Sequence, residues 1–187
     1  MNLAVLFSSM RPFFPGGRLT QGQVEGVEII LKEIGTGLTE HKAYTLATAQ
    51  WETANTMQPI YERGKVSYFD KYEPGTKLGK ALGNIEKGDG YRFRGRGFVQ
   101  ITGRRNYGFA GYKIGIDLIA DPDKALDPHV ASVILWRGMS EGWFTGRKLS
   151  NYLPGNYRDA RRIVNGTDRA REIANLASRW ETALRRA

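Results

Sequence analysis

The sequence predicts a mainly α-helical single domain with one glycine- and aromatic-rich excursion in its first half. Three observations predict this class. Apolar residues recur at spacings of three and four in several segments, some of these segments begin with capping residues, and glycines alternate with aromatic residues in the stretch 56–103. A length of 187 residues is that of one domain. We therefore expect residues 1–187 to form one domain without a second module.

Two helices are predicted before the excursion. The first begins with the capping-box residues Thr20 and Gln23, carries apolar residues at helical spacing and ends before Gly35. The second begins near Thr39 and ends before the Met-Gln-Pro stretch, because proline disfavours helical geometry in the residue before it. At about 100° per residue, Glu52 lies opposite the aliphatic stripe of this helix. Glu52 therefore faces water or a cleft.

The excursion itself shows no helical period. Its composition favours short strands joined by turns, and we expect strands at Val66 to Phe69 and at Phe98 to Thr102. A loop-rich stretch of this length inside one domain is usually functional. We therefore expect the segment of about 56–103 to line a substrate cleft.

Helical patterns return in the second half. Asp127 and Pro128 are an N-cap and first-turn pair, a short helix is expected over 157–164, and Thr167 with Asp168 opens the last helix. The apolar stripe of that last helix is Ile173, Leu176, Trp180 and Leu184, with arginines around it. The stripe predicts either core packing or an interfacial amphipathic helix at an anionic membrane.

Composition excludes several kinds of site. The chain has no cysteine and two histidines far apart in sequence, so disulfides, thiolate nucleophiles and a zinc centre are not expected. We expect no metal and no cofactor. The first residues lack a basic region and a long apolar run, and no membrane span is predicted. We expect synthesis in the cytoplasm, and another factor would release the protein to any substrate outside the membrane.

Positive charge is concentrated in the second half. Residues 1–90 contain ten Lys and Arg against ten Asp and Glu, whereas residues 91–187 contain eighteen against nine, which accounts for the whole net charge of +9. A one-sided basic surface attracts polyanions: nucleic acid, an anionic membrane or a bacterial cell wall. Charge alone does not choose among them.

The remaining catalytic candidates are carboxylates. Hydrolysis of a glycosidic bond needs one carboxyl that donates a proton and a second, ionised carboxylate that activates water or stabilises positive charge. Glu52 follows Trp51 at a helix end, where an apolar neighbour favours the proton donor, and Glu62 lies in a polar loop. Spacing alone favours the interpretation that both glutamates are ordinary solvated residues, because most surface carboxylates have no catalytic role. The competitors for the second role are Asp70, Glu73, Glu86 and Asp89.

One long motif narrows these alternatives. Residues 91–107 read YRFRGRGFVQITGRRNY, which closely resembles the signature of the family 19 glycoside hydrolases, a family of plant-type chitinases and many bacteriophage endolysins. The block ARRIVNG at 160–166 is similar to a second family element, and 115–118 with 142–144 looks like the endolysin branch. The resemblance spans roughly 19–180. It implies a lysozyme-like, mainly helical fold with two lobes around a substrate cleft.

The resemblance also implies roles for individual residues. Glu52 stands where the family has its general acid, although Trp51 replaces the usual histidine. Glu62 matches the second glutamate of the short endolysin version, whereas plant-type spacing points to Glu73. Thr102 matches the hydroxyl that helps hold the attacking water. The positions that match sugar-binding residues of the cleft are Gln100, Asn106, Tyr107 and Asn165, and Arg94 and Arg96 are expected either to pair with the catalytic carboxylates or to brace the loop.

The leading hypothesis is a monomeric endolysin that hydrolyses β-1,4 bonds in the glycan strands of peptidoglycan, with inversion if it follows the family. A chitinase of the same fold is the first alternative. A nucleic-acid-binding protein is a distant one, because the Arg-Gly-Arg-Gly unit occurs once and disordered arginine-glycine binders repeat it. An inactive sugar-binding module is a further alternative, which the presence of both glutamates disfavours.

Overall fold

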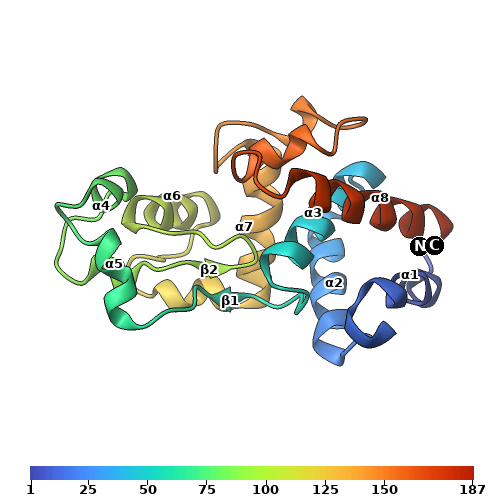
Figure 1. Ribbon diagram of the computed structural model, residues 1–187, viewed down its shortest axis with the longest axis horizontal. Helices are drawn as coiled ribbons and strands as arrows, with labels where there is room; N and C mark the ends of the chain where they lie inside the picture. Colours follow the sequence, from blue (N-terminus) through green and yellow to red (C-terminus); the bar gives the residue numbers. More distant parts are fainter. The chain divides into compact units, whose positions relative to one another are not determined.

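The computed structural model describes all residues, 1–187, and the chain divides into two compact units. Unit 1 comprises Met1–Gln58 and Leu135–Ala187, and unit 2 comprises Pro59–Ile134. The boundary in the second half falls within α7 (Pro128–Glu141). Helices dominate the chain and the one sheet has two strands, so the prediction of a mainly α-helical fold is confirmed (Figure 1).

Unit 1 is built from long helices. They are α1 (Leu3–Met10), α2 (Gln21–Ile34), α3 (Thr39–Glu52) and α8 (Ala170–Arg186), with the short 3₁₀ helices η1 (Arg11–Phe13), η2 (Pro15–Gly17), η5 (Leu149–Asn151) and η6 (Asp159–Ile163). Helix α3 packs along α8, and α1 and α2 contact α8 and α3 respectively. Small residues on α3, such as Ala43 and Ala47, are fully buried and allow this close approach. Both chain ends lie in this unit, where the Asn2 amide donates to the carbonyl of Ala187 (Figure 1).

The beginning of α2 confirms its predicted cap. The Thr20 hydroxyl accepts from the Gln23 amide at 3.2 Å, and the Gln23 side chain accepts from the Thr20 amide at 2.7 Å. Gly26 lies against the chain that follows α3, because a Cβ there would stand 1.7 Å from the carbonyl oxygen of Met57. Only glycine leaves room for that contact, which fixes the end of α3 against α2.

The apolar stripe of α8 is core packing. Ile173 and Trp180 are fully buried, and the Trp180 indole donates to Gln50 Oε1 at 2.9 Å inside the unit. Leu176 and Leu184 are half-buried. The hypothesis of an interfacial membrane helix is therefore wrong for this stripe, because the apolar face is already covered by protein.

Unit 2 is built from short elements around an aromatic core. They are β1 (Ile60–Tyr61), η3 (Val66–Tyr72), α4 (Lys77–Leu82), α5 (Asp89–Arg92), β2 (Arg96–Gly97), α6 (Arg104–Ile114) and η4 (Pro122–Leu126). Strands β1 and β2 are antiparallel, with Ile60 opposite Gly97. The core contains Phe69, Phe93, Phe98 and Tyr107, all essentially inaccessible to solvent.

Both predicted strands of the excursion are wrong. Val66 to Phe69 forms the beginning of η3, in which only Phe69 is buried, so aromatic composition there does not signal a sheet. Phe98 to Thr102 forms a tight turn, and Arg96 and Ile101 exchange backbone hydrogen bonds of 3.2 and 3.0 Å across it. Gln100 has a φ of 54° within the turn, a conformation that interrupts extended chain.

The helix starts of the second half are partly as predicted. Asp127 caps α7, because its Oδ1 accepts from the amides of His129 and Val130 at 2.9 and 3.0 Å. The helix expected over 157–164 is the shorter η6. Helix α8 begins at Ala170 rather than near Thr167, after Arg169 in the left-handed region with a φ of 57°. None of the helices combines the length and apolar character that a bilayer-spanning segment needs.

Candidate active site

Glu52 is the last residue of α3, and Arg161 of η6 holds its carboxylate. Arg161 Nη1 donates to Glu52 Oε1, while Arg161 Nε donates to the Asp168 carbonyl at 3.0 Å. The Arg161 side chain is 4% exposed and that of Glu52 21% exposed, so the pair is largely buried and the carboxylate still reaches the surface. These two hydrogen bonds hold the Arg161 guanidinium in place. Arg161 in turn orients the Glu52 side chain.

Arg161 was not predicted as a partner of Glu52; the expected neighbour was the apolar side chain of Trp51. Arg161 lies in the ARRIVNG block, so that motif was the available signal. A buried phenol lies beside the ion pair: Tyr44 stacks on Tyr157 with ring centroids 5.9 Å apart. Burial raises the pKa of Tyr44, Arg161 lowers it and Glu52 raises it again. This tyrosine therefore stays neutral beside the pair.

Asn165 lies at the surface of the same unit as Glu52. The side-chain Oδ1 of Asn165 accepts from the backbone amide of Gly166 at 2.8 Å. The backbone amide of Asn165 donates to the Arg161 carbonyl at 3.0 Å. Asn165 thus closes η6, the element that carries Arg161, and its side chain is exposed. Its expected role in sugar binding stays a prediction.

Glu62 follows β1 in unit 2 and has three donors around its carboxylate. Oε1 accepts from the Tyr72 hydroxyl at 3.0 Å and lies 3.7 Å from Lys71 Nζ, while Oε2 accepts from the Gly95 amide at 3.1 Å. The Glu62 side chain is 20% exposed. Two hydrogen bonds and one ion pair thus hold the orientation of the Glu62 carboxylate.

Gly95 makes room for this arrangement. A Cβ at Gly95 would stand 2.8 Å from Gln100 Oε1 and 3.2 Å from Glu62 Oε2. Gln100 is anchored by its amide, which donates to the carbonyls of Ile60 and Gly97 at 2.7 and 3.2 Å. The absence of a side chain at Gly95 therefore leaves room for the side chains of Glu62 and Gln100.

Thr102 and Asn106 continue the same polar chain. The Thr102 hydroxyl donates to the Gln100 carbonyl at 3.0 Å, and Asn106 Nδ2 donates to the Thr102 carbonyl at 2.7 Å. Both side chains are half-buried. Gln100, Thr102 and Asn106 of unit 2 therefore form one hydrogen-bonded chain, and Gly95 lies against both Glu62 and Gln100.

Arg96 and Tyr107 do not offer their side chains to a ligand. Arg96 is 3% exposed and pairs with Asp123 at 2.8 Å, and Tyr107 is fully buried, accepting from Arg96 at 3.0 Å and donating to the Arg94 carbonyl at 2.8 Å. The expectation that Arg96 pairs with a catalytic carboxylate and that Tyr107 binds sugar is corrected: both brace the 94–97 loop from inside. Arg94 is half-buried between the rings of Tyr61 and Tyr91, 4.4 and 4.1 Å from their centroids.

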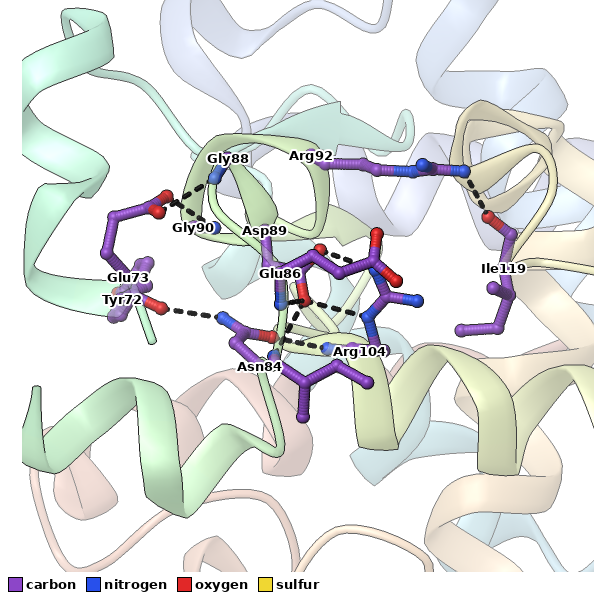
Figure 2. A network of polar contacts seen from close by, with 11 residues as sticks. Tyr72, Glu73, Asn84, Glu86, Gly88, Asp89, Gly90, Arg92, Arg104 and Ile119 are labelled. Atoms are coloured by element: carbon purple, nitrogen blue, oxygen red, sulfur yellow. Dashed lines mark hydrogen bonds and ion pairs between the residues drawn. The ribbon is translucent and has the colours of Figure 1, made fainter. Parts of the chain in front are cut away.

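The competing acids of unit 2 hold loops (Figure 2). Glu73 accepts from the amides of Gly88 and Gly90 at 2.7 and 2.9 Å. Asp89 is 1% exposed and accepts two bonds of 2.7 Å from Arg104. Burial alone would raise the pKa of Asp89, but the bonds from Arg104 and from two backbone amides hold it below its ordinary value. Both carboxylates are therefore occupied by the fold itself.

No group of three or more His, Cys, Asp or Glu side chains is placed to bind a metal ion. The chemistry that these residues support is thus that of carboxylates, a hydroxyl and amides.

Comparison with known proteins agrees with this chemistry. Residues 81–146 match the family model described as Chitinase class I. In this segment the chain is similar to the family 19 glycoside hydrolases. The matched segment includes Gln100, Thr102 and Asn106, whereas Glu52 and Glu62 precede it.

Solved structures confirm the lysozyme-like chitinase fold of this chain. Chitinase C from Streptomyces griseus HUT6037 matches with a TM-score of 0.63 and 19% identity, covering 96% of this chain and 90% of that one. A mutant of chitinase C matches with a TM-score of 0.60 and 20% identity over 98% and 92% of the two chains. A bacterial family 19 chitinase matches with a TM-score of 0.58 and 19% identity, covering 96% of this chain and 92% of that one. No curated protein matches by sequence.

Proposed function

We propose that the protein is an endolysin that cleaves the β-1,4-glycosidic bonds of peptidoglycan with inversion of the anomeric carbon. The observation that carries this proposal is the setting of Glu62: two hydrogen bonds and an ion pair orient a carboxylate that remains one-fifth exposed. Gly95 lies against both Glu62 and Gln100, and the Gln100 carbonyl accepts from the hydroxyl of Thr102. This is what a general base for a water molecule needs, because an oriented and ionised carboxylate can accept its proton.

Glu52 is the proposed general acid. Its Oε1 is bound by Arg161, so a proton on the other carboxyl oxygen is free to pass to the leaving sugar oxygen. Glu62 removes a proton from water, and the hydroxyl of Thr102 helps to hold that water. The side-chain oxygens of Gln100 and Asn106 are proposed to accept hydrogen bonds from the acetamido and hydroxyl groups of the sugars. Attack on the face opposite the leaving group inverts the anomeric configuration.

The substitutions Glu52→Gln and Glu62→Gln test these roles. Each keeps the side-chain shape and removes one proton-transfer group, so we expect hydrolysis of purified peptidoglycan to fall at least about 10²-fold. Glu73→Gln is the matched control, because it changes a carboxylate of the same unit that bonds to backbone amides. A Glu62→Gln enzyme as active as wild type, or a Glu73→Gln enzyme inactivated to the same degree while folded, would remove Glu62 from the mechanism.

The anomer of the first product tests inversion. Proton NMR of the products, recorded before mutarotation, should show the configuration opposite to that of the cleaved bond. Mass spectrometry of fragments released from peptidoglycan identifies the reducing-end sugar and hence the bond. A first product with the configuration of the substrate would refute inversion.

Chitin hydrolysis is the second candidate, and it is favoured by the three chitinase structures that share the fold. Parallel assays with peptidoglycan and with chitin oligomers separate the two, because an endolysin should clear cell-wall suspensions and release little from chitin. We further propose that the enzyme acts as a monomer on the wall after another factor has released it from the host cytoplasm. Light scattering of the purified protein tests the monomer.

A further inference from the structure

A cavity of about 460 Å³ lies in unit 1 where η6 meets the beginning of α8. Four arginines line it, Arg158 and Arg162 from the η6 region and Arg169 and Arg171 from the start of α8, together with the acids Asp159 and Glu172. The lining therefore carries four positive and two negative side chains, a net charge of +2. Nothing in the proposed hydrolytic mechanism uses this cavity.

Most of its positive charge has no partner within the protein. Arg158, Arg162 and Arg171 are exposed and make no ion pair or side-chain hydrogen bond within contact distance, whereas Arg169 contacts Glu172 at 3.2 Å. Hydrogen bonds to its own backbone amide and to Arg169 lower the pKa of Glu172, and the charges of Arg169 and Arg171 lower it further. Asp159 is engaged locally, accepting from Asn156 Nδ2 at 2.8 Å. Three guanidinium groups around one cavity thus remain available for an anionic ligand.

The backbone adds to this field. Helix α8 is 17 residues long and no side chain caps its N-terminus, where Arg169 adopts the left-handed conformation. The N–H groups of a first helical turn lack intrahelical acceptors, and the helix dipole is positive there. The cavity therefore combines free guanidinium groups with the positive end of a long helix.

The cavity is also close to the proposed acid. Arg158 and Arg162 flank Arg161 in the chain, and Arg161 contacts Glu52. One short 3₁₀ helix, η6, thus carries the partner of Glu52 and contributes to the arginine-lined cavity. We therefore expect the substituents of a glycan strand bound at Glu52 to approach this cavity.

We propose that the arginine-lined cavity binds the carboxylate groups of the peptides attached to the glycan strand, and this inference rests on the proposed function. Chitin is neutral, whereas the lactyl-linked peptides of peptidoglycan carry carboxylates at alternate sugars. Guanidinium groups bind carboxylates through paired, charge-assisted hydrogen bonds. The cavity would therefore favour peptide-bearing glycan over neutral glycan.

The test is the triple variant Arg158→Gln, Arg162→Gln and Arg171→Gln. Its kcat/KM is measured on peptidoglycan and on the same glycan strands freed of peptides by an amidase. One exposed ion pair changes affinity by about fivefold at most, so we expect the triple variant to lose on the order of tenfold on peptide-bearing strands. Activity on peptide-free strands should stay unchanged.

A control variant has the same change in net charge elsewhere in unit 1: Arg11→Gln, Arg18→Gln and Lys32→Gln. These residues are exposed, make no ion pair and do not line the cavity. An equal loss in this control, or an equal loss on both substrates in the cavity variant, would overturn the proposal, because overall charge or general damage would then account for it.

A binding measurement separates this inference from the catalytic proposal. Calorimetry with muramyl dipeptide and with its carboxyl-amidated form needs no hydrolysis. Wild type should bind the dipeptide more tightly than the amidated form, and the cavity variant should lose the difference. Equal binding of both forms, or binding of inorganic phosphate as tight as that of the dipeptide, would overturn the assignment even if the enzyme hydrolyses peptidoglycan. If the wild-type protein does not hydrolyse peptidoglycan but still binds the dipeptide more tightly than its amidated form, the result counts against the proposed function alone.

Discussion

The ion pair between Arg161 and Glu52 makes a quantitative prediction for Arg161→Met. The substitution keeps most of the side-chain volume but removes a charge-assisted hydrogen bond to Glu52 and a second bond to the Asp168 carbonyl. Breaking a fully buried ion pair costs about 3–5 kcal/mol. Glu52 is 21% exposed and Asp168 is exposed, so water replaces part of what is lost. We expect a loss of about 2–3 kcal/mol in the free energy of unfolding.

Tryptophan fluorescence reports this loss selectively. All four tryptophans lie in unit 1, at positions 51, 136, 143 and 180, so the signal follows the unit that contains the pair. For a domain of this size the loss corresponds to a decrease in melting temperature of about 5–10 °C. Urea unfolding at neutral pH gives the free energy directly.

The matched control is Arg158→Met, which removes an arginine of the same region that has no ion pair and should change stability by less than about 0.5 kcal/mol. A double-mutant cycle with Glu52→Met isolates the pair, and we expect a coupling energy of about 1–2 kcal/mol. If Arg161→Met and Arg158→Met change the free energy of unfolding equally, or if the coupling energy of the cycle is zero, Arg161 does not hold Glu52.

Two further substitutions in unit 2 give separate predictions. Gly95→Ala places a methyl group against Glu62 and Gln100, so hydrolysis should fall about tenfold or more while circular dichroism stays that of wild type; unchanged kinetics would contradict the proposed geometry. Asp89→Asn should cost about 2–3 kcal/mol at neutral pH. The pKa of folded Asp89 lies below its ordinary value of 3.8, so its contribution is present above that pH and is lost as the pH falls through the folded pKa. The difference in melting temperature between Asp89→Asn and wild type should therefore shrink as the pH falls below 3.8, and a constant difference would count against the Arg104 pairing.

The sequence predicted the start of a helix correctly where the helix begins with a capping side chain. The capping box at Thr20 and the aspartate cap at Asp127 both hold in the structure, because each joins groups only two or three residues apart. The start of α8 was misplaced, because Arg169 caps it through backbone conformation rather than through a side chain. The strands expected in the excursion failed because aromatic residues there form a small core instead of a sheet.

Local patterns in the sequence were enough to predict the helical class, the glycine-rich motif of 91–107 and the shortlist of carboxylates. The partners of each carboxylate became known from the folded chain. Glu62 is bound by the amide of Gly95, 33 residues away, and Glu52 by Arg161, 109 residues away, whereas Glu73 accepts from the amides of a loop. Hydrogen bonds and ion pairs depend on distances in space, and no periodicity along the chain encodes contacts between segments so far apart.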